Sequence, residues 1–207
     1  IGQPHSGNDY FGQTLAYYND YLIVSSPRED TGTTDAGSAY IFKKDEGGVD
    51  NWGHIKTLRN PGINGTVDSY SYFGDRIDID GDYLCISAYG IHNRREGRND
   101  NNAGAVFIFK KDEGGTDNWG LIKTIQSQRL LSNSNFYFGY DISISDDVLV
   151  ISNKYHVSSD TQGSEVYLRN GNNWEYSEKL WDSDKPYGGT GTTYFGYKLK
   201  TDSNYIL

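Results

Sequence analysis

Apolar and polar residues alternate along much of this chain in short runs with a period of two. Residues 76–80 read Arg-Ile-Asp-Ile-Asp, and residues 141–145 read Asp-Ile-Ser-Ile-Ser. Such alternation is typical of a β-strand with one buried face, and these runs are rich in β-branched and aromatic residues. No stretch carries a convincing helical stripe. The pattern therefore predicts an all-β protein.

The strand pattern recurs behind a repeated Tyr-Phe-Gly triplet. The triplet begins at Tyr10, Tyr72, Tyr137 and Tyr194, so the units are about 60 residues long, which is a blade-sized period. In the first unit the predicted strands cover residues 11–18, 21–25, 38–43 and 52–58. Residues 42–58 and 109–125 are nearly identical, which indicates recent duplication. Each unit is predicted to contain four strands.

The connections within a unit differ in kind. Strands one and two are joined at residues 19–20, 81–82, 146–147 and 203–204 by residue types that tolerate the left-handed backbone of a tight hairpin. The connections between strands two and three vary freely in length and sequence. Variable loops on a rigid sheet are where binding residues are disproportionately found.

A four-stranded antiparallel unit repeated in tandem is typical of a β-propeller blade. We predict a single propeller segment over residues 1–207, with blades at about 10–60, 72–127 and 137–181 and a partial blade at 194–207. Propeller rings need about four to eight blades. We therefore expect a fragment of a larger propeller, and the alternative is that copies of the chain complete a ring together.

Several motifs recur in the same order in each unit. They are the Tyr-Phe-Gly opening, the segments Ile-Val-Ser-Ser-Pro and Cys-Ile-Ser-Ala-Tyr at the place of a Gly-Ala-Pro tripeptide, the Gly-Ser-Ala-Tyr-Ile-Phe strand and a late tryptophan. In these features practically the whole chain resembles FG-GAP repeats, the blades of integrin α-chain propellers and of many extracellular bacterial and protist proteins. The resemblance implies an extracellular or cell-surface recognition or adhesion module that binds a protein or a glycan through its loops.

One feature departs from the calcium-binding members of that family. Their first hairpin carries an Asp-x-Asp-x-Asp-Gly type loop, in which alternate oxygen ligands surround the cation. Here only the second unit, with Asp78, Asp80 and Asp82, resembles such a loop. Because Asp78 and Asp80 alternate with isoleucines, the solvent-facing side of a strand is the simpler interpretation. We predict no cofactor and no metal, and these three aspartates are the calcium candidates.

Composition narrows the possible partners and the location. The formal charge of −9 argues against nucleic acid, and acidic residues directly follow the lysine pairs at 43–44 and 110–111. No apolar run is long enough to cross a membrane. The single cysteine, Cys85, takes the place of Ile23 and Val150 on an apolar strand, so we expect a buried, inert thiol. Asn64 begins an Asn-Gly-Thr glycosylation sequon.

The variable loops supply the candidate ligand-binding residues, since equivalent propeller loops emerge on one face. Arginine and carboxylate groups there could hold a polar partner through charge-assisted hydrogen bonds. The candidates are Arg28, Glu29, Asp30, His92, Arg94, Arg95, Tyr155 and His156. The alternative is that these residues belong to ordinary solvated loops.

Aromatic residues fall into two groups. Aromatic residues that recur at the same position of successive units are expected to pack between blades, namely Tyr10, Tyr72, Tyr137, Tyr194, Trp52, Trp119 and Trp174. Aromatic residues that do not recur at one position of the repeat are candidates for stacking on a sugar ring, namely Tyr89, Tyr155, Trp181 and Tyr187.

Two other classes of function stay open. A propeller glycosidase or lyase would need paired carboxyl groups, and the candidates on the strand nearest the axis are Asp75, Asp78, Asp80 and Asp141. No catalytic motif surrounds them, so we predict that the protein is not an enzyme. The alternative to recognition is a structural subunit of an extracellular fibre or coat, which would assemble with copies of itself through blade surfaces.

Overall fold

The structure is a computed structural model that describes residues 8–92, 101–127, 136–154, 163–180, 198–202 and 205–206. The first sheet contains β1 (Leu15–Tyr18), β2 (Tyr21–Ser26), β3 (Ser38–Lys44) and β4 (Trp52–Arg59). The second contains β5 (Ile77–Asp80), β6 (Tyr83–Ala88), β7 (Ala105–Lys110) and β8 (Gly120–Ile125). The third contains β9 (Ile142–Ser145), β10 (Val148–Ser152), β11 (Ser164–Asn170) and β12 (Asn173–Leu180). A last hairpin pairs β13 (Thr201–Asp202) with β14 (Tyr205–Ile206).

Every sheet is an antiparallel meander in which strands that follow one another in the chain lie side by side. The described residues form strands and turns and no helix. The prediction of an all-β protein built from four-stranded blades is confirmed, and we call the three sheets blade 1, blade 2 and blade 3.

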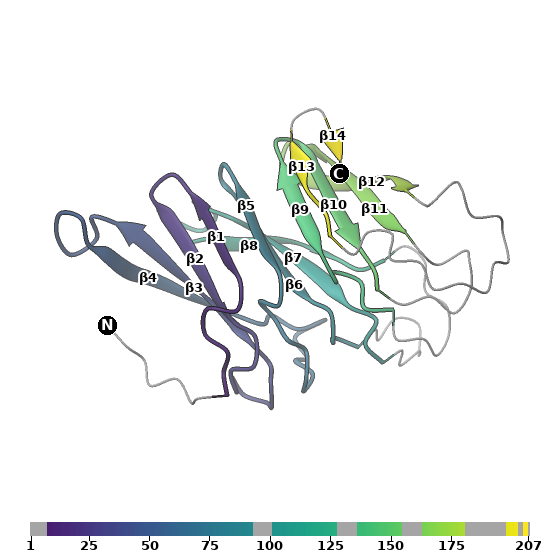
Figure 1. The fold of residues 1–207 in the computed structure, drawn as a ribbon, viewed down its shortest axis with the longest axis horizontal. Coiled ribbons are helices and arrows are strands. Elements are labelled where there is room, and N and C mark those ends of the chain that lie inside the picture. Colours follow the sequence, from purple (N-terminus) through teal and green to yellow (C-terminus); the bar gives the residue numbers. More distant parts are fainter. Residues whose placement is uncertain are drawn as a thin grey trace, which may run out of the picture.

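The first strand of each blade lies against the first strand of the next. β1 contacts β5, β5 contacts β9 and β9 contacts β13, so these strands form the inner row of the molecule. Figure 1 shows the blades fanned along this row from β1 at one end to β13 and β14 at the other. This is the arrangement of neighbouring propeller blades.

The tight hairpins between first and second strands have the predicted left-handed backbone. The first turn residues are Asn19, Gly81 and Asp146, with φ of 50°, 58° and 51°. Glycine, asparagine and aspartate adopt this conformation at low cost, which explains why they occupy these positions.

The first strands begin later than predicted. β1 begins at Leu15, because Tyr10 and Gly12 are left-handed, with φ of 55° and 91°, and the Gln13 N–H donates to the Tyr10 carbonyl at 3.0 Å. A left-handed residue cannot continue a β-strand. The Tyr-Phe-Gly triplet is therefore a turn that precedes the strand.

The phenylalanine of the triplet joins one blade to the preceding one. Phe73 is fully buried, and its N–H donates to the Ala36 carbonyl of blade 1 at 3.1 Å. Gly37 passes so close that a Cβ added there would lie 2.2 Å from the Phe73 carbonyl oxygen. Gly104 and Phe138 repeat this joint between blades 2 and 3, with a corresponding distance of 2.1 Å. Only glycine allows such an approach.

The hydrophobic core lies between the blades. One cluster joins Ile23 and Ile41 of blade 1 to Ile79 and Leu84 of blade 2. A second cluster joins the opposite face of blade 2, including Cys85, to Ile144, Leu149 and other residues of blade 3. Cys85 is fully buried, as predicted, and burial raises the pKa of its thiol well above the ordinary value.

The late tryptophans of blades 2 and 3 pack between blades as predicted. Trp119 and Trp174 are each 1% exposed and meet Tyr21 and Tyr83 of the preceding blade edge to face, with ring centroids 5.4 and 5.9 Å apart. The prediction is wrong for Trp52, which is 38% exposed. Trp52 belongs to blade 1, where no described blade covers that face.

Candidate functional site

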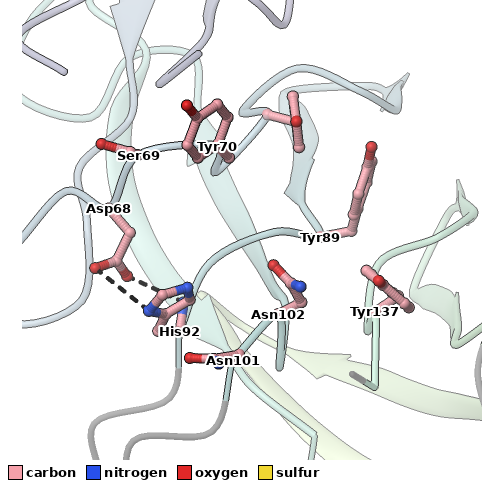
Figure 2. Close-up of a pocket in the computed structure, with 9 residues that line it drawn as sticks. Asp68, Ser69, Tyr70, Tyr89, His92, Asn101, Asn102 and Tyr137 are labelled. Atoms are coloured by element: carbon pink, nitrogen blue, oxygen red, sulfur yellow. Dashed lines mark hydrogen bonds and ion pairs between the residues drawn. The ribbon is translucent and has the colours of Figure 1, made fainter. Parts of the chain in front are cut away.

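A pocket of about 750 Å³ lies at the loop end of blade 2. Its wall comes from the segment that precedes β5, from both ends of the loop between β6 and β7, and from the residue before Phe138 (Figure 2). The lining residues are Asp68, Ser69, Tyr70, Tyr72, Tyr89, His92, Asn101, Asn102 and Tyr137. The pocket thus collects segments that are far apart in the sequence.

Three tyrosines form one wall of the pocket. Tyr89 stacks on Tyr72, with ring centroids 5.2 Å apart and planes at 25°, and meets Tyr137 edge to face at 5.7 Å. Tyr72 and Tyr137 open the triplets of consecutive blades and are only half-buried. They were expected between the blades, but their left-handed backbone, with φ of 55° and 49°, keeps them at the loop end while the next residue enters the core.

The hydroxyl groups of Tyr72 and Tyr89 stay protonated over the physiological range. Burial, followed by the nearby Asp75 carboxylate, raises the pKa of Tyr89. Burial also raises the pKa of Tyr72, followed by the effect of Asp35. Tyr72 and Tyr89 therefore offer neutral phenols that can donate and accept hydrogen bonds.

The other end of the pocket is polar. Asp68 is buried, and its Oδ2 accepts the main-chain N–H of His92 at 3.0 Å. The His92 Nδ1 lies 4.0 Å from the other carboxylate oxygen, and Figure 2 shows the two side chains facing each other. Tyr70, which is 53% exposed, lies two residues after Asp68, and its ring centroid is 6.4 Å from that of Tyr72.

The candidates in the first variable loop have separate roles. The Arg28 guanidinium lies 4.6 Å from the ring centroid of Tyr10 and 5.7 Å from that of Tyr72, so it extends the aromatic wall toward blade 1. Glu29 accepts the Tyr40 hydroxyl, and Asp30 accepts the Asp35 N–H at 2.8 Å. Two predicted binding residues thus lie at the site, Arg28 beside the tyrosine wall and His92 in the pocket. Glu29 and Asp30 instead form hydrogen bonds that stabilise the loop between β2 and β3.

Several predicted residues lie outside the described part of the chain. They are Arg94, Arg95, Tyr155 and His156 among the binding candidates, and Trp181, Tyr187 and Tyr194 among the aromatic residues.

The calcium candidates engage neighbouring groups of the protein. Asp78 Oδ2 accepts the Ile144 N–H at 2.9 Å and the Ser143 hydroxyl at 3.2 Å, so Asp78 joins blade 2 to blade 3 and is not simply solvated. Asp80 accepts the Asp146 N–H in the same way, and Asp82 lies 3.9 Å from Lys111. Within the described ranges, no group of three or more His, Cys, Asp or Glu residues is arranged to hold a metal ion.

The remaining carboxylate candidates for catalysis flank one arginine. Arg76 Nη1 lies 2.8 Å from Asp75 Oδ2, and Arg76 Nε lies 3.3 Å from Asp141 Oδ1. Asp141 also accepts the Leu199 N–H at 2.8 Å. The arrangement ties the inner strands of three successive units together.

The sequon residue Asn64 is exposed at a tight turn. Ile63 and Thr66 exchange two main-chain hydrogen bonds of 3.0 Å across this turn. Glycosylation at Asn64 stays a prediction.

Sequence reasoning missed Asp68, Tyr70 and Asn101. They lie in connections between repeated motifs, where the units do not align, and only the fold shows that these connections converge. One signal was present, because Tyr70-Ser71-Tyr72 adds an extra tyrosine just before the second triplet.

Consecutive four-stranded meanders packed face to face along a row of inner strands define a β-propeller type of repeat protein. The family model for the FG-GAP repeat matches residues 4–42 and 67–109, and each match runs from the segment before the triplet to the third strand. The chain therefore carries FG-GAP repeats in these two segments. No curated protein matches it.

FG-GAP repeats typically occur in extracellular or cell-surface proteins, where they serve adhesion and recognition. Among the described residues, no helix has the length and apolar character needed to span a membrane.

Proposed function

We propose that this chain is an extracellular recognition module and that the tyrosine-walled pocket binds a glycan. The observation that carries the proposal is the convergence of Tyr70, Tyr72, Tyr89 and Tyr137 with the buried carboxylate of Asp68 around one pocket. Its volume of about 750 Å³ falls within the range of ordinary ligand sites. A site that pairs aromatic faces with a few placed polar groups suits a ligand with both apolar and polar faces.

A sugar ring has that character. Its C–H faces can lie against the tyrosine rings, and its hydroxyl groups can exchange hydrogen bonds with phenols, amides and a carboxylate. Asn101 supplies an exposed amide at the pocket, and Tyr70 supplies an exposed ring. The loop location is the one at which repeat scaffolds usually place binding residues.

We favour binding over catalysis for these residues. The paired carboxylates that a glycosidase needs must face each other across the substrate. Here Asp75 and Asp141 lie on either side of Arg76, and Asp78 accepts hydrogen bonds from blade 3. The proposal involves no cofactor and no nucleic acid.

A glycan array followed by titration calorimetry with the strongest ligand tests the proposal. We expect Tyr70→Ala to weaken binding about tenfold, the loss of roughly 1.4 kcal/mol. The matched control is Tyr176→Ala, which removes a comparably exposed tyrosine, 44% against 53%, from β12 of blade 3. An array without any ligand, or equal affinity of both variants, would overturn the proposal.

A further inference from the structure

A row of tyrosines and basic side chains crosses the loop ends of blades 1, 2 and 3. We call it the loop-end row and define it by Arg28 of blade 1, Tyr72 and Tyr89 of blade 2, and Tyr140 and Lys154 of blade 3. Successive members lie 5.7, 5.2, 6.5 and 4.6 Å apart, measured from ring centroids to each other or to the side-chain cation. Because Tyr72 and Tyr89 also line the pocket, the pocket lies beside the middle of a longer surface.

The repeat places the members of the row side by side. In blades 2 and 3 the triplet glycine donates its N–H at 2.9 Å to the carbonyl of a serine in the second strand, Ser87 or Ser152. This hydrogen bond joins the triplet turn to the start of the following loop. Tyr89 and Lys154 each follow that serine by two residues, so they leave their blades at equivalent positions. The row is therefore built by the geometry that the blades share.

The two ends of the row are cationic. Arg28 and Lys154 are exposed, and neither forms an ion pair within the part of the chain that the structure describes. The Arg28 guanidinium lies over the rings of Tyr10 and Tyr72, which leaves its N–H groups available to another partner. Burial and then Asp35 raise the pKa of Tyr72, and Arg28 opposes the rise.

Carboxylates near the row already have partners. Asp75 and Asp141 flank Arg76, with contacts of 2.8 and 3.3 Å. Burial raises the pKa of Asp75, and Arg76 and Lys198 oppose the rise, so two cations act on this pair of carboxylates. Asp68 in the pocket accepts a main-chain N–H at 3.0 Å. Although the formal charge of the chain is −9, the row thus keeps positive charge at both ends.

We propose that the loop-end row binds a linear acidic glycan, with sugar rings against Tyr72 and Tyr89 and with carboxylate or sulfate groups at Arg28 and Lys154. The proposal rests on the proposed function and adds the length and charge of the ligand. Both cations form charge-assisted hydrogen bonds with such groups. Each step along the row is comparable with one sugar unit, so only a chain of several units reaches both ends.

Titration calorimetry with oligogalacturonates of increasing length tests the span of the site. We expect the hexasaccharide to bind about tenfold more tightly than the disaccharide, or more. Arg28→Ala and Lys154→Ala should each weaken hexasaccharide binding about fivefold or more. The double variant should lose most of the advantage of the longer chain, because that advantage requires both ends of the row.

Two control variants separate the site from charge in general. Lys44→Ala removes an exposed lysine at the far end of β3 and should leave the affinity unchanged. Lys154→Arg retains the cation over Tyr140 and should retain the affinity. Circular dichroism establishes that each variant is folded.

Hexasaccharides of different charge test the ligand class. A carboxylated oligogalacturonate and a sulfated heparin fragment should bind more tightly than neutral maltohexaose, with an affinity that falls as salt rises. The tighter of the two acidic chains identifies the anionic group. A polyglutamate peptide of similar length tests whether charge alone is sufficient, and it should bind more weakly than either acidic glycan.

Three results would overturn the proposal. They are equal affinity for neutral and acidic chains, unchanged hexasaccharide affinity in Arg28→Ala and Lys154→Ala, and a peptide that binds as tightly as the acidic glycans. Glycan binding that still depends on Tyr70 would then leave the proposed function of the pocket in place. Absence of binding to any glycan would reject both the pocket function and the row.

Discussion

Glycines beside the triplet phenylalanine set how closely two blades can approach. Gly37 has a φ of 85° and lies against the Phe73 main chain, so its position demands both a left-handed backbone and the absence of a Cβ. Gly32 in the same loop shares the backbone, with a φ of 86°, but has open space around its Cα. Substitutions at Gly37 and Gly32 therefore separate the free-energy cost of a left-handed backbone from the cost of a clash with the Phe73 main chain.

We predict that Gly37→Ala lowers the free energy of unfolding by about 3 kcal/mol or more, because strain at a left-handed residue adds to a backbone clash. Gly32→Ala should cost about 1 kcal/mol, the conformational part alone. Urea denaturation of both variants measures the difference. Equal losses for Gly37→Ala and Gly32→Ala would mean that blades 1 and 2 can move apart at Gly37 at no cost. The close approach of the two blades would then not be important for stability.

Asp117 links protonation to stability at the first blade interface. Partial burial opposes its ionisation, but hydrogen bonds from Lys43 and Tyr21 outweigh this and lower the pKa of the carboxyl. A group whose pKa is lower in the folded state adds stability above its unfolded pKa of about 3.9. That stability is lost as the pH falls through the folded pKa.

Asp117→Asn should therefore reduce the free energy of unfolding by about 1 kcal/mol at pH 7, an effect limited by partial solvent screening. The difference from the unmodified chain should shrink as the pH falls below about 4. Asp50→Asn, the same change at the corresponding exposed position of blade 1, should leave the free energy of unfolding at pH 7 unchanged. A loss for Asp117→Asn that does not vary with pH would point to packing instead of charge.

At the scale of the element, the sheet of blade 2 has two faces with different partners. In blade 2, Ile79 and Leu84 face blade 1, whereas Cys85 and Ile108 face blade 3. This explains why every residue of β6 is buried, although the sheet is antiparallel. An antiparallel sheet commonly faces water on one side, and a strand covered on both sides reads as a continuous apolar run.

We predict different costs for the same substitution in equivalent strands. Trp119→Ala should lower the free energy of unfolding by about 3–5 kcal/mol, because the tryptophan is buried against Tyr21. Trp52→Ala should cost about 1 kcal/mol or less, because its ring is already partly in water. Thermal denaturation measures both losses. Similar losses would contradict the view that burial of the tryptophan ring decides the cost.

The repeat made the elements predictable, whereas the site depends on how different units meet. Period-two alternation and turn residues identified the strands. Tyr89 drew attention because the other units have no tyrosine at the same position of the repeat. Trp52 was misjudged because repetition suggested the same surroundings for every copy, although among the described residues blade 1 packs against a blade on one face only. Asp78 was interpreted as solvent-facing because a strand pattern contains no information about hydrogen bonds across blades.

At the scale of the whole molecule, blade 2 lies between blades 1 and 3, so both faces of its sheet are covered. We predict that the amides of β6 and β7 exchange with deuterium more slowly than those of β1 and β12, which have many exposed residues. Hydrogen exchange with peptide-level mass analysis measures this. Comparable protection of all four strands would mean that the three blades open only as one unit.

Blade 2 contains both halves of the joints that hold it, since Phe73 fits blade 1 and Gly104 admits Phe138 of blade 3. An in-frame duplication of one unit therefore delivers a blade already compatible with its neighbours on both sides. Because contacts in such arrays are between nearest neighbours, lengthening requires no new interface. The near-identity of residues 42–58 and 109–125 is the trace that growth of this kind would leave.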